Sequence, residues 1–111
     1  MFLEILRCRN PQFIETTIKL HQQGHLPPNT VVIDLDTVET NARTFKKTAD
    51  QAGIKVFAMT KQMGRNPDFI KALLRAGIDK VVAVDLAGAR ACHAAGIGIG
   101  HLGHLVQIPR S

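Results

Sequence analysis

The tripeptide Ala-Gly-Ile occurs three times in the sequence, at residues 52–54, 76–78 and 95–97. Each copy follows a segment with helical spacing of apolar residues and precedes a segment with strand character. Glycine adopts the left-handed conformation that ends a helix, and isoleucine returns the chain to the core. Helix and strand signals that alternate in this way predict βαβ units, whose strands are parallel. The repeat therefore indicates an α/β fold with a parallel sheet.

Capping signals and apolar periodicity predict the individual elements. Asn10 and Pro11 are typical of a helix start and Gly24 of a helix end. Asp36 and Glu39 have the spacing of a capping box for a second helix. The expected strands are Thr30–Leu35, Lys55–Thr60, Lys80–Val84 and part of Ile97–Val106, and the expected helices are Gln12–Gln23 and three that begin near Asp36, Asn66 and Asp85.

Four strands with three intervening helices are compatible with two architectures. They could form a small doubly wound domain, or the first half of an eight-stranded barrel, which needs about 250 residues. The last residues directly follow a strand. We therefore expect a partial (β/α)8, TIM-type barrel, with residues 1–29 as an N-terminal helix and connector and residues 30–111 as βα units. Open sheet edges favour pairing with another copy, so we also expect a homo-oligomer.

Composition excludes several classes of function. The 111 residues include 14 basic and 9 acidic side chains, but the basic ones are dispersed and there is no Tyr or Trp to stack on bases. We expect no nucleic-acid partner, and the net charge of +5 fits an anionic small ligand better. No window approaches the ~18 apolar residues of a membrane span, and Glu4 and Arg7 interrupt the N-terminal apolar segment. We expect no membrane association, a cytoplasmic location and free thiols at Cys8 and Cys92.

The apolar segment Val56–Thr60 ends abruptly at Lys61, and a glycine turn and a helix start follow. A lysine at the exit of a buried strand must reach water, pair with an anion or lose its charge. An uncharged lysine is a nucleophile that readily forms a Schiff base with a carbonyl compound. The simplest alternative is that Lys61 only extends from the strand end into solvent.

The residues around Lys61 resemble the N-terminal barrel domain of the alanine racemase family, whose cofactor is pyridoxal 5′-phosphate (PLP). In that family an apolar strand ends in the lysine that binds the cofactor, here Phe57–Lys61. The closer similarity is to the YhfX-like and ornithine-racemase-like subgroup, in which a glycine and an Asn-Pro helix start follow the lysine, here Gly64–Pro67. Further similar segments are Ile33–Asp36 with Asn41, Val82–Asp85 and Gly100–Pro109.

The resemblance implies the N-terminal fragment of a PLP-dependent, amino-acid racemase-like enzyme. Lys61 would form the internal aldimine and act as the proton-transfer base on an amino acid or related amine. Arg65 stands where alanine racemase has a tyrosine that holds the cofactor phosphate, and an arginine could donate to that phosphate instead. Asp85 and His101 are further candidate cofactor-binding residues. The family's second base and its main phosphate-binding loops would lie outside this sequence.

The candidate residues also have purely structural interpretations. Asp85 could serve only as the N-cap of the next helix, and Arg65 could belong to a solvated turn. Asp34, inside an apolar segment, would need a partner such as a lysine. His101 and His104 are three residues apart, so a strand would direct them to opposite faces, and we expect no metal site.

Two functional alternatives stay open at this stage. One is a PLP-binding homeostasis or carrier protein of the same barrel fold without turnover. The other is a non-catalytic α/β fragment that is stable only as an assembly. A racemase needs a second base opposite its lysine, so we expect the fragment alone to be inactive.

Overall fold

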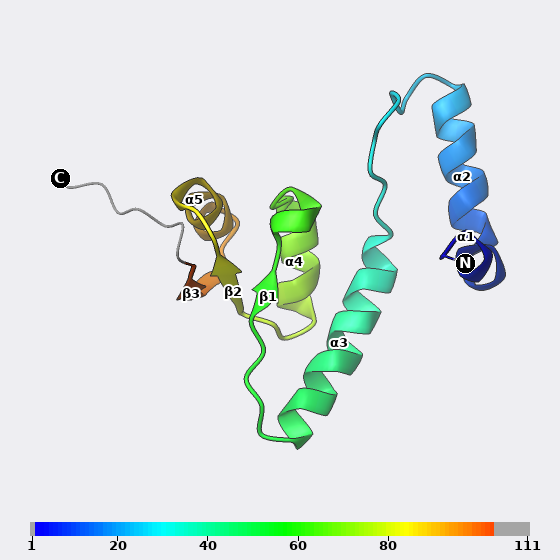
Figure 1. Cartoon of the computed structure of the whole chain (residues 1–111). Coiled ribbons are helices and arrows are strands. Elements are labelled where there is room, and N and C mark those ends of the chain that lie inside the picture. Colours follow the sequence, from blue (N-terminus) through cyan, green and yellow to red (C-terminus); the bar gives the residue numbers. More distant parts are fainter. Residues whose placement is uncertain (1, 104–111) are drawn as a thin grey trace. The chain divides into compact units, whose positions relative to one another are not determined.

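The computed structural model describes residues 2–103 and divides the chain into two compact units, Met1–Asp34 and Leu35–Ser111 (Figure 1). The first unit contains two helices, and the second contains a parallel sheet with its helices. Within residues 2–103, none of the helices has both the length and the apolar character needed to cross a membrane.

The first unit confirms the helix predicted after Asn10 and adds one before it. Helix α1 spans Phe2–Arg9 and helix α2 spans Pro11–Gln22. The Asn10 side chain accepts a hydrogen bond from the Phe13 backbone N–H at 3.1 Å, so it caps α2 as predicted. Helix α1 has an acidic residue in its first turn and basic residues in its last, an arrangement that complements the helix dipole.

The strand predicted over Thr30–Leu35 is wrong. Residues 30–34 form no strand, and helix α3, Leu35–Gln51, begins where the strand was expected to end. β-branched residues favour a strand only where a neighbouring strand supplies hydrogen bonds and packing, and among residues 2–103 no strand pairs with this segment. Asp34 instead accepts a hydrogen bond from the Asn10 side-chain amide at 2.7 Å. A pairing of Asp34 with a lysine stays a prediction.

The capping box predicted for α3 is also wrong. The helix starts at Leu35, two residues earlier than an N-cap at Asp36 predicts, so Asp36 lies in its first turn, where its charge still favours the positive end of the helix dipole. Glu39 reaches away from the helix start and accepts hydrogen bonds from Arg43 and Arg75, both at 2.7 Å. Because Arg75 belongs to helix α4, Pro67–Arg75, this ion pair joins α3 to α4, which lie side by side (Figure 1).

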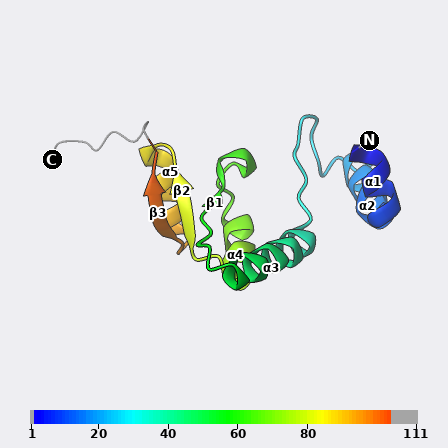
Figure 2. The same ribbon diagram turned by 60° about the horizontal axis from the view of Figure 1, so that its bottom comes forward.

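The described part of the second unit, residues 35–103, contains three parallel strands in the order β1-β2-β3 (Figure 2). They are β1, Ala58–Met59, β2, Lys80–Ala83, and β3, Gly98–Leu102, with helix α5, Leu86–Ala94, between the last two. The parallel sheet and the strands at 80 and 98 confirm the sequence interpretation. β1 is much shorter than the predicted Lys55–Thr60, and the part of the last predicted strand beyond residue 103 lies outside the described residues.

Both crossover helices cover the same face of the sheet. Ile70 of α4 and Cys92 of α5 form one buried cluster with Val81 of β2 and with Ile97. Asn66 caps α4 by accepting hydrogen bonds from the backbone N–H groups of Asp68 and Phe69, at 2.9 and 3.1 Å. Because β1 and β3 both pair with β2 in parallel, the carboxyl ends of all three strands lie at one edge of the sheet.

Candidate functional site

Lys61 lies at the edge where the three parallel strands end. It follows β1 after one residue and opens a short 3-10 helix, η1, Lys61–Met63. Asp85 follows β2 and Gly103 follows β3 at the same edge. In parallel α/β folds this carboxyl edge is where catalytic and binding groups are found.

Thr60 anchors the strand end immediately before Lys61. Its side chain is almost completely buried, with 1% exposed, and its hydroxyl lies 3.4 Å from the thiol of Cys92 on α5. Lys61 itself is exposed. Thr60 is buried and Lys61 is exposed, so the Lys61 side chain reaches solvent. This is the first of the three outcomes expected for a lysine at this position.

The loop after Lys61 is held tightly by its own backbone. The Thr60 carbonyl accepts hydrogen bonds from the N–H groups of Met63 and Arg65, both at 3.1 Å, and the Lys61 carbonyl accepts one from Gly64 at 3.2 Å. Gly64 and Arg65 both have left-handed backbones, with φ of 61° and 56°. The left-handed conformation is unusual for an arginine, so the loop Thr60–Asn66 fixes the direction in which its side chain leaves the backbone.

Arg65 and Asp85 meet across this edge of the sheet. The Arg65 Nη2 and an Asp85 carboxylate oxygen form an ion pair, with 28% and 40% of the two side chains exposed. The other Asp85 oxygen accepts the backbone N–H of Gly88 at 2.5 Å, so Asp85 also caps α5 as predicted. A single aspartate thus links the loop that contains Lys61 to the start of α5.

His101 is the predicted site residue that the structure does not join to the others. It lies on β3, paired in register with Val82 of β2, and its side chain is exposed. Within residues 2–103, no hydrogen bond or ion pair connects it to Lys61, Arg65 or Asp85. His104 lies outside the described residues. Among residues 2–103, no group of three or more His, Cys, Asp or Glu side chains could hold a metal ion.

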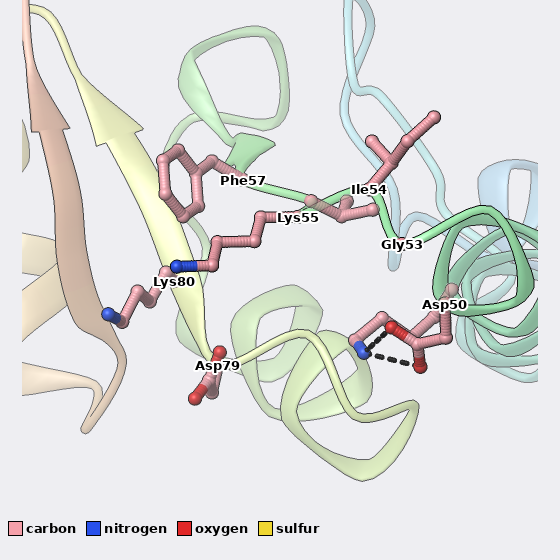
Figure 3. Close-up of a pocket in the computed structure, with 9 residues that line it drawn as sticks. Asp50, Gly53, Ile54, Lys55, Phe57, Asp79 and Lys80 are labelled. Atoms are coloured by element: carbon pink, nitrogen blue, oxygen red, sulfur yellow. Dashed lines mark hydrogen bonds and ion pairs between the residues drawn. The ribbon is translucent and has the colours of Figure 1, made fainter.

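The opposite edge of the sheet, where the strands begin, is hollowed by two cavities of about 400 Å³ each. One is largely apolar, and the other has three lysines and two aspartates in its wall (Figure 3). In the charged cavity Asp50 forms an ion pair with Lys46 at one end, and the side chains of Lys55 and Lys80 lie at the other. Neither cavity includes a residue of the Lys61 loop, and no sequence motif predicts either cavity.

Sequence reasoning missed two residues of the carboxyl edge. The sequence predicts Thr60 only as the end of a strand, although its buried hydroxyl contacts Cys92. It predicts no role for Gly88, although Gly88 lies in the first turn of α5 beside both Asp85 and Arg65. A glycine within a helix destabilises that helix relative to alanine. The presence of a glycine in a predicted helix is therefore the signal that could have identified Gly88.

No protein-family model matches the chain. The chain is 44% identical over 109 residues to the uncharacterized protein YhfX of Escherichia coli strain K12. The match includes 98% of this chain and 28% of the relative, so the chain spans just over a quarter of the relative's length. The similarity to a YhfX protein agrees with the subgroup indicated by the sequence motifs, and the name of the relative assigns no activity.

Proposed function

We propose that the chain is the N-terminal part of a PLP-dependent, amino-acid racemase-like enzyme of the alanine racemase family, and that the cofactor binds to Lys61. One observation supports this most directly. Lys61 is an exposed lysine at the carboxyl edge of a parallel sheet, and its loop also holds a cation, Arg65, fixed by Asp85. A primary amine can form a Schiff base with the aldehyde of PLP, and a guanidinium is well suited to bind its phosphate.

The described residues would have the following separate roles. Bound PLP supplies an electron sink for negative charge at the substrate's α-carbon. Lys61 would bind the cofactor, and its amine, once released, would move a proton at that carbon. Arg65 would donate hydrogen bonds to the phosphate. Asp85 and His101 stay proposed cofactor-site residues, the first beside Arg65 and the second on the neighbouring strand.

A barrel is the architecture that we propose for the longer protein. In a doubly wound sheet the strand order reverses, and helices cover both faces. Here the strands follow one another in sequence order, and α4 and α5 pack against the same face. This arrangement is the one that repeats around a (β/α)8 barrel. The other face of the sheet would then be turned toward the barrel interior.

The activity of the whole protein is part of the same proposal, because the chain spans 28% of the relative's length. The proposed substrate is an amino acid or related amine, and racemisation is the leading reaction. A homo-oligomeric state and a cytoplasmic location also stay proposals.

The proposal is tested by titrating the chain with PLP and following the absorbance band near the visible edge that a lysine adduct gives. We expect this band in the wild type and its loss in Lys61→Ala. Lys55→Ala is the matched control, because Lys55 is also exposed but lies beside the charged cavity at the opposite edge. A band of unchanged size in Lys61→Ala would exclude Lys61 as the cofactor lysine.

A further inference from the structure

Gly88 lies at a position where any side chain would displace Arg65. It is buried in the first turn of α5. A Cβ atom built on Gly88 would overlap the Arg65 Nε, and it would lie 3.2 Å from Arg65 Cζ and 3.0 Å from an Asp85 oxygen. The guanidinium group therefore rests against the bare backbone of the α5 turn. A glycine that destabilises its own helix here makes room for this contact.

Asp85 holds the same guanidinium group from a second direction. One carboxylate oxygen pairs with Arg65 Nη2, and the other accepts the Gly88 N–H at 2.5 Å. One Asp85 oxygen thus binds Arg65 and the other binds Gly88, so the carboxylate sets the position of these two residues relative to each other. The carboxylate cannot rotate to follow a moving guanidinium without giving up the cap of α5.

The backbone of Arg65 is fixed as well. Its φ of 56° is in the left-handed region, and its N–H donates to the Thr60 carbonyl at 3.1 Å. The side chain thus starts from a constrained backbone and ends against a helix turn and a carboxylate. A guanidinium has five N–H donors, which is enough to bind a carboxylate and a second anion at once.

We propose that Asp85 and Gly88 are positioning residues, which hold the Arg65 guanidinium in a preformed orientation so that it recognises the phosphate of the cofactor. This inference rests on the proposed function. It assigns Asp85 a role through Arg65 rather than a direct contact with PLP, and it adds Gly88 to the site. A preformed donor loses little conformational entropy on binding, which increases its contribution to affinity.

Removing the charge of Asp85 distinguishes a positioning role of this residue from a purely electrostatic effect on phosphate binding. Asp85→Asn keeps an oxygen that can cap α5 but removes a negative charge beside Arg65. If only the local charge mattered, this change would strengthen phosphate binding. If Asp85 acts by holding Arg65 in place, the same substitution weakens phosphate binding. The two accounts therefore predict opposite signs.

The experiment compares the dissociation constants of PLP and of pyridoxal, which lacks the phosphate, for the 111-residue chain and its variants. A charge-assisted contact to the phosphate should make PLP bind about tenfold more tightly than pyridoxal. We expect Arg65→Met to reduce this preference to near unity, and Gly88→Ala and Asp85→Asn to reduce it several-fold. In Gly88→Ala the urea midpoint should stay the same or rise, because alanine favours the helix and the overlapping atoms belong to a flexible side chain.

Several controls make each outcome decisive. Lys71→Met removes a positive charge from the exposed face of α4 and should leave the preference unchanged. Affinities are measured only under conditions in which circular dichroism shows that the variant is folded. In Lys61→Ala the preference for PLP should persist, so a failure of Lys61 to bind the cofactor can be told apart from a failure of this inference. An equal affinity for PLP and pyridoxal in the wild type, or an unchanged preference in Gly88→Ala and Asp85→Asn, overturns the inference.

Discussion

Arg65 and Asp85, twenty residues apart in sequence, form an ion pair that joins the loops after two neighbouring strands. The first of these loops contains Lys61, and the second begins α5. Because both partners follow strands that end at the same edge, the pairing is a direct result of the parallel sheet. It gives the carboxyl edge a fixed cation close in sequence to an exposed lysine amine.

The buried cluster between the two crossover helices should dominate the stability of the sheet unit. Ile70 of α4 has 0% of its side chain exposed, so Ile70→Ala should lower the free energy of unfolding by about 2–5 kcal/mol. Ile54→Ala is the matched control: 60% of Ile54 is exposed, and a change within about 0.5 kcal/mol is expected. Urea denaturation measures both. Equal losses would contradict the assignment of the core.

The ion pair between α3 and α4 should depend on pH in the acidic range. The hydrogen bond from Arg75 is the largest effect on the Glu39 carboxyl and lowers its pKa. Desolvation opposes it in part, and the hydrogen bond from Arg43 lowers the pKa further, so the pKa lies below its usual range. A lowered folded pKa means that this stabilisation is complete above the ordinary carboxyl pKa of about 4.3 and is lost as the pH falls through the folded value.

The test compares the urea midpoint between about pH 6 and pH 3, a range that brackets the carboxyl pKa. Glu39→Gln should lower the midpoint near pH 6 and converge with the wild type at acidic pH. Glu15→Gln, which removes an exposed carboxylate from α2, should follow the wild type throughout. A constant difference between Glu39→Gln and the wild type at every pH would show that the ion pair is not responsible.

The two cysteines should differ sharply in reactivity. Cys8 is exposed, whereas Cys92 has 1% of its surface exposed and packs in the core cluster. A thiol reagent should therefore modify one cysteine per chain rapidly under native conditions and the second only after unfolding. Cys8→Ser should abolish the rapid phase. Two rapid phases would mean that α5 does not hold Cys92 against the core cluster, and no reaction after unfolding would indicate a disulfide.

The helices could be predicted from sequence because their start signals are local. Asn10, Asn66 and Asp85 were each expected to begin a helix, and each side chain accepts a hydrogen bond from a backbone N–H two or three residues later. The partners of such a cap lie within one turn, so the signal needs no information about the rest of the fold. The exception, Asp36, lies inside α3 because that helix begins at Leu35, two residues before the start that a cap at Asp36 predicts.

The strands were harder to predict, because a strand is defined by partners that are distant in sequence. Thr30–Leu35 and Lys55–Thr60 have similar β-branched and apolar character, yet the first forms no strand and the second forms only Ala58–Met59. Local composition cannot tell whether a neighbouring backbone will be present. The sequence therefore indicated the type of sheet but not the extent of each strand.

Only part of the candidate site could be predicted, because some of its contacts depend on residues that are distant in sequence. Lys61 and Asp85 were expected at strand exits, and the parallel sheet places them at one edge. The ion pair of Asp85 with Arg65 depends on the left-handed backbone of Arg65 and on the bare surface of Gly88, neither of which has a sequence signature strong enough to predict it. His101 is a candidate because of its place in the C-terminal half of the last predicted strand, and its role stays a prediction.

The central claim is that Lys61 is the residue to which PLP binds, and reductive labelling tests it most directly. The chain is incubated with a limiting amount of PLP and reduced with borohydride, and the modified peptide is mapped by mass spectrometry. The account predicts that the label is found on Lys61, at the carboxyl edge of the sheet. A label on Lys55, Lys71 or Lys80 in preference to Lys61, or no label on any lysine, would contradict it.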